Sequence, residues 1–173
     1  MKALMRHLIA PALALAPAQA GEVSAAIGIF TLSDGLDLQV GYRPEQSRWQ
    51  FGYRFVRWTE GFEFGGSKLT DTTTTKTGPL INYYFRPEAR GSWYVGAALL
   101  HWTQEEKSTR TGTRDKDSKL APFLGGGYRG KLGGSVYYNL GLFLSPAELK
   151  TSTADSTEET TGADVQVQLG IAF

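Results

Sequence analysis

The chain ends in Val165-Gln-Val-Gln-Leu-Gly-Ile-Ala-Phe173, a stretch in which apolar side chains alternate strictly with polar or small ones. On an extended strand, successive side chains point to opposite faces. One face therefore carries Val165, Val167, Leu169, Ile171 and Phe173, and the other carries Asp164, Gln166, Gln168, Gly170 and Ala172. Such a strand separates an apolar environment from a polar or tightly packed one, which predicts a β protein.

The same alternation recurs in seven earlier segments. They cover residues 23–30, 36–42, 49–56, 79–85, 93–102, 120–129 and 135–144. From Gly21 onward no segment has a convincing helical period. With residues 164–173 the pattern predicts eight strands, an even number, as closed antiparallel membrane barrels have.

The connections between these segments are alternately short and long. Short turns are predicted within 42–49, 85–93 and 128–136, and long polar loops over 60–77, 103–119 and 145–161. A short connection around Ser33-Asp34-Gly35 completes the long-loop end. Short turns at one end and long loops at the other are typical of bacterial outer-membrane barrels.

A repeated motif marks the short turns. Tyr42-Arg43-Pro44-Glu45 recurs 43 residues later as Phe85-Arg86-Pro87-Glu88 and, after a further 43, in weaker form as Tyr128-Arg129-Gly130. These aromatics and the tryptophans that follow predict an interfacial girdle of Tyr42, Trp49, Phe85, Trp93 and Tyr128. Chance repetition of turn chemistry in any β meander, or duplication of an ancestral hairpin, would give the same echo.

The second face of the strands decides between a membrane barrel and a soluble one. A soluble barrel such as a lipocalin would carry Lys, Glu and Thr on that face, whereas here it carries glycines and amides, which suit a narrow interior. We expect Tyr94, Arg54 and Gln166 to fill the interior. If Tyr42 and Trp49 flank the first turn, Asp37 lies opposite Arg54. An unpaired charge is costly in a dry interior, so we predict a lumenal Asp37–Arg54 ion pair.

The N-terminus has the pattern of a secretory signal peptide. Basic residues precede an apolar run from 8 to 16, and Ala18-Gln19-Ala20 follows as a small-x-small cleavage site. We predict a signal peptide over 1–20 and a barrel domain over 21–173. Cleavage removes Lys2 and Arg6 from the 18 basic residues, leaving 16 against 17 acidic ones, a net charge of −1.

Composition bounds the remaining possibilities. The 173 residues suit one domain, and a net charge of +1 gives no indication of nucleic-acid binding. There is no cysteine, which excludes disulfides and thiolate metal sites. The mean hydropathy of −0.26 is too low for a helical membrane protein. A barrel tolerates it, because half of each strand faces a filled interior.

The C-terminal strand resembles the terminal assembly signal of bacterial outer-membrane proteins. Val167, Leu169, Ile171 and Phe173 match its pattern of apolar residues at every second position before a final aromatic. Signal, strands and terminus together resemble the small eight-stranded barrels typified by the OmpA transmembrane domain and OmpX. The resemblance implies recognition by the barrel-assembly machinery. It implies no activity, because no family-specific internal motif is present.

Candidate catalytic chemistry is sparse. His101, Thr103 and Glu105 share one strand face near the outer rim, and the order faintly resembles the His-x-Ser motif of outer-membrane lipid A deacylases. Thr in place of Ser, the position on the fifth strand and the early Glu105 depart from that motif. The alternative is a rim His and Thr that meet lipid headgroups. His101 is the single histidine after residue 20, so no multi-histidine metal site is expected, and no cofactor is predicted.

These features predict an all-β, eight-stranded antiparallel up-and-down transmembrane barrel in a bacterial outer membrane, monomeric, with both termini periplasmic. We expect partners among outer-membrane lipid and lipopolysaccharide, whose phosphates rim Lys and Arg residues would pair. The function expected is surface interaction or envelope integrity through the long loops. A lipid A acyl hydrolase using His101 and Thr103, or a narrow channel, are the alternatives.

Overall fold

The structure, a computed structural model, describes residues 21–28, 35–64, 67–108, 111–153 and 156–173. The predicted signal peptide of residues 1–20 and most of the short connection around Asp34 lie outside these ranges. No helix in the described part of the chain is long and apolar enough to cross a membrane.

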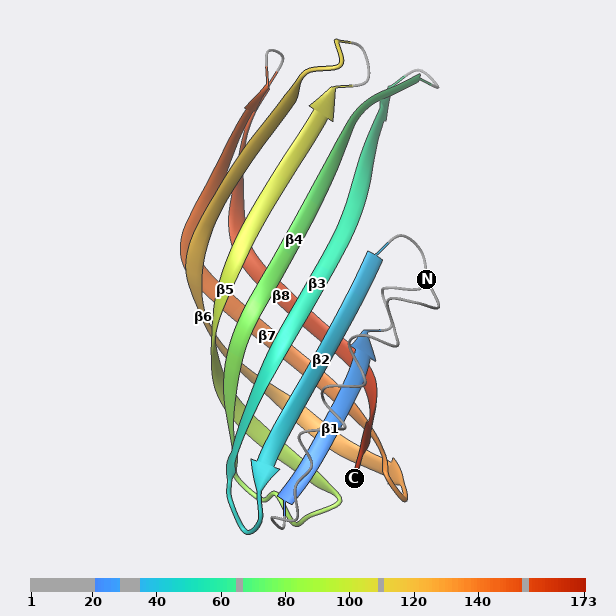
Figure 1. Ribbon diagram of the computed structural model, residues 1–173, viewed down its shortest axis with the longest axis vertical. Helices are drawn as coiled ribbons and strands as arrows, with labels where there is room; N and C mark the ends of the chain where they lie inside the picture. Colours follow the sequence, from blue (N-terminus) through green and yellow to red (C-terminus); the bar gives the residue numbers. More distant parts are fainter. Residues whose placement is uncertain (1–20, 29–34, 65–66, 109–110, 154–155) are drawn as a thin grey trace.

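Eight strands close into one barrel (Figure 1). They are β1 (Gly21–Gly28), β2 (Gly35–Pro44), β3 (Trp49–Phe64), β4 (Ser67–Tyr84), β5 (Gly91–Ser108), β6 (Arg114–Gly133), β7 (Val136–Thr153) and β8 (Ser156–Ala172). Each strand pairs antiparallel with its neighbours in the chain, and β1 pairs with β8 from Ser24↔Ala172 to Gly28↔Gln168. The predicted eight-stranded, antiparallel, up-and-down barrel is confirmed.

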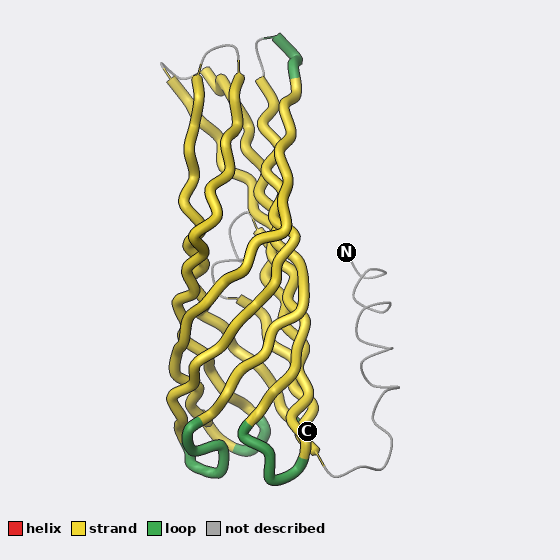
Figure 2. The backbone as a smooth tube through the Cα atoms, turned by 90° about the vertical axis from the view of Figure 1, so that its left-hand side faces the viewer, coloured by secondary structure: helices red, strands yellow, loops and turns green. Residues whose placement is uncertain are grey.

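The long polar connections are strands rather than loops, so that prediction was wrong. β5 continues to Ser108 and β6 begins at Arg114, where residues 103–119 were expected to be a loop. The threonine-rich segment of 70–77 likewise pairs with both β3 and β5. Threonine favours strands, and cross-strand hydroxyl pairs such as Thr59–Thr73 at 3.0 Å add to the pairing. Figure 2 shows these strands rising together well above the short ones.

The outward face of the barrel carries an apolar belt. On β3 the belt runs from Trp49 to Phe55, and on β5 from Trp93 to Leu99. About seven residues of strand span about 23 Å, comparable with the apolar band of membrane barrels. Its side chains are large and exposed, with Leu124 at 65% and Trp93 at 66%. A continuous exposed apolar surface of this kind fits lipid and not water.

The belt ends along one row of paired residues. In register, Phe55 lies beside Thr77, Thr77 beside His101, and His101 beside Leu120. Beyond this row the outward side chains become polar, beginning with Arg57 on β3 and Ser118 on β6. We call the described strand ends from this row upwards, residues 57–64, 67–77, 101–108, 111–119, 145–153 and 156–163, the crown.

The crown is not a uniform continuation of the barrel. The ladder between β6 and β7 runs from Gly133↔Val136 to Leu124↔Leu144, so among the described residues it does not join the two hairpins above that pair. The β7–β8 ladder shifts between Ser145 and Glu148, and Pro146 lies in that shift. Proline has no N–H to donate, which explains a bulge at this position.

Candidate functional site: the lumen and its rims

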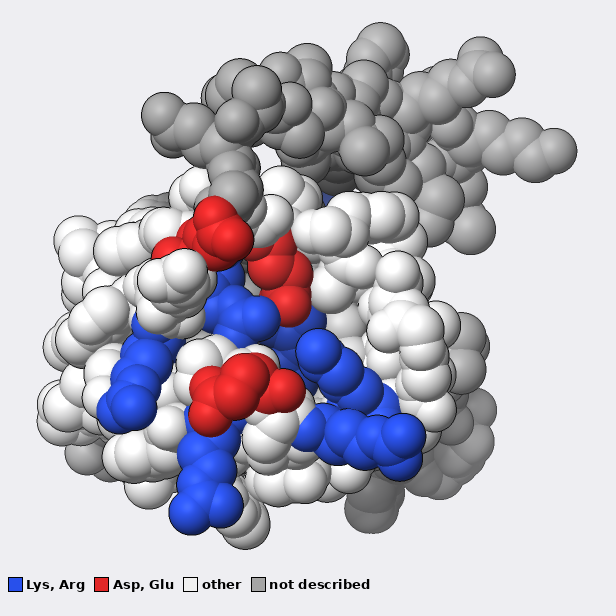
Figure 3. All heavy atoms as spheres, turned by 90° about the horizontal axis from the view of Figure 1, so that it is seen from below, with Lys and Arg blue, Asp and Glu red and all other residues white. Residues whose placement is uncertain are grey.

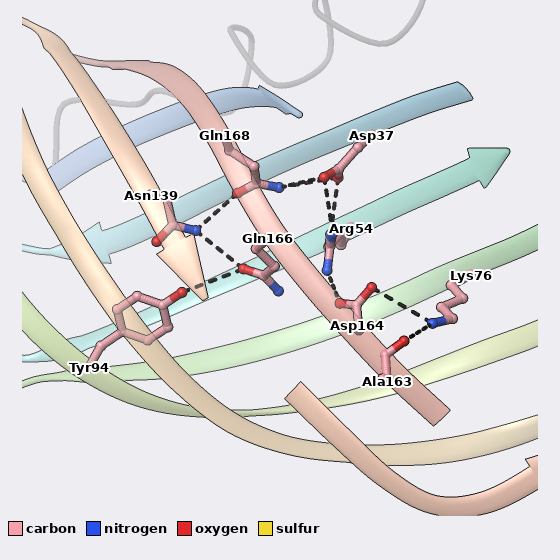
Figure 4. A network of polar contacts seen from close by, with 9 residues as sticks. All are labelled: Asp37, Arg54, Lys76, Tyr94, Asn139, Ala163, Asp164, Gln166 and Gln168. Atoms are coloured by element: carbon pink, nitrogen blue, oxygen red, sulfur yellow. Dashed lines mark hydrogen bonds and ion pairs between the residues drawn. The ribbon is translucent and has the colours of Figure 1, made fainter. Parts of the chain in front are cut away.

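A buried cation at the centre of the lumen holds two acidic side chains (Figure 4). Arg54 on β3 donates from Nε and Nη2 to the two oxygens of Asp37 on β2, both at 3.0 Å. Its Nη1 bonds Asp164 on β8. Arg54 is only 2% exposed. A planar guanidinium satisfies two carboxylates in this fork geometry, which offsets their desolvation.

The Asp37–Arg54 contact arises from a register that differs from the predicted one. Asp37 lies beside Val56, and Arg54 beside Gln39, two residues further along than expected. A shift of two residues keeps both side chains inside the barrel, because side chains alternate with period two. Arg54 therefore reaches Asp37 on the diagonal.

Lys76 extends this network towards the crown. Its ammonium donates to the Ala163 carbonyl at 2.7 Å and lies 3.8 Å from Asp164. Three aromatic rings surround it at 5.1–5.2 Å, those of Trp58, Trp102 and Phe123. Aromatic faces attract a desolvated cation, so this cage stabilises a buried lysine that the carboxylate reaches only at long range.

On the other side of Arg54, amides and a tyrosine fill the lumen. Gln168 donates to Asp37, and Asn139 bridges Gln168 and Gln166 at 3.0 and 3.2 Å. Tyr94 reaches Gln166 and is 2% exposed. Gly127 and Gly141 make room for it, since a Cβ at either position would lie 2.6 or 2.5 Å from the Tyr94 hydroxyl oxygen. The predicted filling by Tyr94, Arg54 and Gln166 is confirmed.

Sequence reasoning missed two members of the network. Asp164 is 110 residues away from Arg54 in the chain, and Lys76 fell within a predicted loop. Asp164 was on the predicted polar face of the last strand, and this position was the signal that its side chain points into the barrel. For Lys76 the signal would have been the alternation of Thr74, Lys76 and Gly78, all buried, with the less buried Thr73, Thr75 and Thr77.

The structure does not bring His101, Thr103 and Glu105 together as a catalytic site. All three point outward from β5. Thr103 Oγ1 lies 3.5 Å from His101 Nδ1, but Glu105 pairs with Arg114 on β6 at 3.6 Å. His101 and Glu105 are about 13 Å apart along the strand, too far for the carboxylate to orient the imidazole. Among the described residues no group of three or more His, Cys, Asp or Glu side chains is placed to hold a metal ion.

The predicted girdle residues all face outward at the lower border of the belt. Trp93 packs against Tyr128 with ring centroids 5.2 Å apart, and Trp49 packs against Tyr83 at 4.9 Å. Arg48 donates to the Tyr83 hydroxyl oxygen at 3.1 Å, and this bond raises the pKa of the Arg48 guanidinium. Tyr42 and Phe85 are exposed in the same region, by 38% and 50%.

The residues of the predicted assembly signal line the outward face of β8. Leu169, Ile171 and Phe173 are exposed by 43–65%, and Val167 precedes them on the same face. Phe173 also closes the seam of the barrel, since its backbone exchanges hydrogen bonds with Val23 at 2.8 and 3.1 Å.

Comparisons with known proteins place this fold. No protein-family model matches the chain, and no curated protein is similar to it in sequence. Among solved structures, Ail of Yersinia pestis superposes with a TM-score of 0.55 at 17% identity, covering 88% of this chain and 99% of Ail. Neisserial surface protein A gives 0.54 at 13% identity, covering 88% and 92%. The N-terminal β-barrel domain of Pseudomonas aeruginosa OprF gives 0.53 at 13% identity, covering 88% and 96%.

These likenesses, together with the closed eight-stranded barrel, define the class. The chain has the fold of the small eight-stranded outer-membrane barrels.

Proposed function

We propose that the chain is a monomeric outer-membrane protein of a Gram-negative bacterium, exported by residues 1–20 and cleaved after Ala20. Its short turns face the periplasm and its crown faces the outside of the cell. The apolar belt supports this placement, because a spanning sheet must close and must present apolar side chains to lipid. The solved structures that it resembles are outer-membrane proteins.

The function that this geometry supports is a surface platform rather than a pore. The observation that carries the proposal is that β3–β8 continue beyond the end of the belt while the lumen at belt level is filled by the Arg54 network. A rigid paired crown holds its side chains in fixed positions, which suits binding of a partner at the cell surface or contact between envelope components.

The lower crown fits contact with lipopolysaccharide. Arg57 is exposed and points outward just beyond the belt, and Lys116 and Arg114 are exposed on the outward face of β6, four and six residues beyond Leu120. Guanidinium and ammonium groups at the level of lipid headgroups pair with phosphate. The outward threonines, with Thr77 bonded to the Tyr53 hydroxyl at 3.1 Å, offer hydroxyl groups to the sugars of the same lipid.

Cysteine labelling tests the placement and the orientation, because the natural chain has no cysteine. Thr111→Cys at the tip of the crown should react with a membrane-impermeant maleimide on intact cells. Glu45→Cys in the opposite turn should react only after the outer membrane is permeabilised. Both positions are exposed in the folded barrel, so they form a matched pair. Equal labelling of the two in intact cells, or fractionation of the protein away from outer membranes, would overturn the proposal.

A further inference from the structure

The short-turn end of the barrel opens into a cavity that we call the vestibule. Its volume is about 880 Å³, and it is lined by the turns around Gln46, Glu88 and Gly134 together with Glu22 and Arg129 inside the mouth. A smaller recess of about 20 Å³ adjoins the vestibule. Four charged residues line both cavities: Glu22, Arg43, Arg129 and Lys131. Figure 3 shows Lys and Arg side chains gathered around this end.

Two guanidinium groups, that of the half-buried Arg43 and that of the buried Arg129, share one carboxylate at the mouth. Arg43 Nη2 lies 2.8 Å from Glu22 Oε2, and Arg129 Nη2 lies 2.8 Å from Glu22 Oε1. Further contacts fix both cations: Arg43 donates to the Pro87 carbonyl at 3.2 Å, and Arg129 stacks on the Tyr137 ring at 3.7 Å. One negative charge therefore faces two positive charges held in place by the barrel.

The surplus of positive charge grows towards the recess. Arg90 and Lys131 also line it, so four cationic side chains there face the single carboxylate of Glu22. A concave site lined by one sign of charge concentrates ligands of the opposite sign. The other acidic groups of the vestibule are Glu45, Glu88 and the terminal carboxylate of Phe173, and none of these residues lines the recess.

We propose that the vestibule binds a carboxylate-bearing peptide of the periplasmic cell wall, an inference that rests on the proposed orientation of the barrel. Each arginine contacts Glu22 through a single nitrogen, so the two guanidinium groups keep further N–H donors that can pair with a second carboxylate. The mouth lies within the ring of short turns and not on the lipid-facing belt. Its volume is within the range of small-ligand sites, about 300–1,000 Å³.

The site includes non-polar surface beside its charge. Pro44, Pro87 and Tyr137 line the vestibule next to the arginines. A peptide with a free carboxylate would place the charged group against the cations and its aliphatic part against these rings. A bare inorganic anion would use only the first of these contacts.

The test is calorimetric titration of the refolded chain from Gly21 to Phe173 in detergent with soluble peptidoglycan fragments that carry free carboxylates. We expect binding that weakens as salt is added. Arg90→Gln with Lys131→Gln should weaken it by about twofold to thirtyfold, the loss expected for two exposed charge pairs. Both side chains are exposed, and the bond from Lys131 N to the Arg90 carbonyl is a backbone one, so the double variant should fold.

The matched control is Arg114→Gln with Lys116→Gln, the same two exchanges at the crown end, which should leave the affinity unchanged. Equal affinity for fragments whose carboxylates are amidated would overturn the proposal. So would binding of inorganic phosphate or of anionic phospholipid micelles in the absence of fragment binding. Because the titration is done in detergent, its failure leaves the orientation, which the labelling experiment tests, untouched.

Discussion

Arg54 determines the electrostatic balance of the lumen, because it compensates two buried carboxylates at once. Replacing it by Met should leave Asp37 and Asp164 without their main partner. We expect Arg54→Met to lower the free energy of unfolding by about 3–5 kcal/mol, which is the cost of removing one partner of a buried ion pair. Urea unfolding in lipid vesicles measures this. Arg57→Met, on the same strand but outward and exposed, should change the free energy by less than about 0.5 kcal/mol.

Neutralising the acids provides the internal check on that prediction. Asp37→Asn and Asp164→Asn, added to Arg54→Met, remove the charges that the single change leaves uncompensated. The triple variant should regain part of the lost stability. If it is less stable than Arg54→Met alone, the arginine acts through packing and not through its charge.

At the same scale, the separation of His101 and Glu105 argues against hydrolysis at the outer rim. A nucleophilic hydroxyl needs a base that a third group orients, and Glu105 instead pairs with Arg114. We expect the acyl pattern of lipid A to be the same in cells with and without the protein, by mass spectrometry. A loss of an acyl chain on overexpression that His101→Ala and Thr103→Ala both abolish would contradict this expectation.

Two factors decided which single residues could be placed from the sequence. One was the alternation of side chains along a strand, and the other was the number of residues that separate two contacting side chains in the chain. Asp37 and Arg54 were placed inside because alternation fixes the face of every residue on a strand. Their register was off by two residues because Tyr42 pairs with Phe51 and not with Trp49, which moves the centre of the β2–β3 turn one residue further along the chain. Asp164 could not be paired with Arg54 from the sequence, because closure of β8 against β1 sets their proximity.

At the scale of the strand, the belt and the crown differ in the solvent that their outward face meets. Leu124 lies mid-belt on β6 and Ser118 lies outward beyond it. Leu124→Arg should lower the free energy of unfolding by about 2–4 kcal/mol, and Ser118→Arg by about 0–1 kcal/mol, because the cost of a cation on the lipid face depends on depth. Refolding in vesicles over a urea series measures both. Equal penalties would show that the belt is not where lipid begins.

Strand ends were harder to predict than strand faces. The apolar alternation that identified 93–102 and 120–129 ends where the outward face leaves the belt. Between Trp102 on β5 and Leu120 on β6 both faces are polar, so threonines and alternating charges there look like a loop in the sequence. The paired neighbour, which hydrogen-bonds the backbone whatever the side chains are, extends β5 to Ser108 and starts β6 at Arg114.

The last strand forms part of the barrel wall, and it is also expected to carry an assembly signal. We propose that the barrel-assembly machinery reads Phe173 and the apolar residues before it. Phe173→Ala should lower the amount of protein inserted in cells while the purified variant still refolds in vesicles. Phe51→Ala is the matched control, since both rings are exposed on the outside, at 51% and 65%. If the two variants insert equally well, the C-terminal phenylalanine has no special part in assembly.

At the scale of the whole molecule, polar layers stacked along the axis close the lumen. Lys76 with its aromatic cage lies on the crown side, Arg54 with its two acids comes next, and Tyr94 with the glutamines lies beyond. Towards the short turns, Tyr84 donates to Gln50 at 2.9 Å, and the arginines that share Glu22 occupy the mouth. The layers are linked through Asp164 and Gln168, but each fills its own section of the lumen, so the removal of one leaves side chains in the others.

This redundancy makes conductance a property of several layers together. The wild-type barrel in planar bilayers should give no single-channel steps. Arg54→Ser with Asp37→Ser and Asp164→Ser, which removes one layer, should give none either. A variant that also replaces Tyr94 and Lys76 by Ser should conduct only when Tyr84, Gln50 and the two arginines at the mouth are replaced as well, because an eight-stranded barrel has room for water along its axis only where side chains are taken away. Discrete steps from the wild type would mean that the layers open together, and the protein would then be the narrow channel that its sequence also allowed.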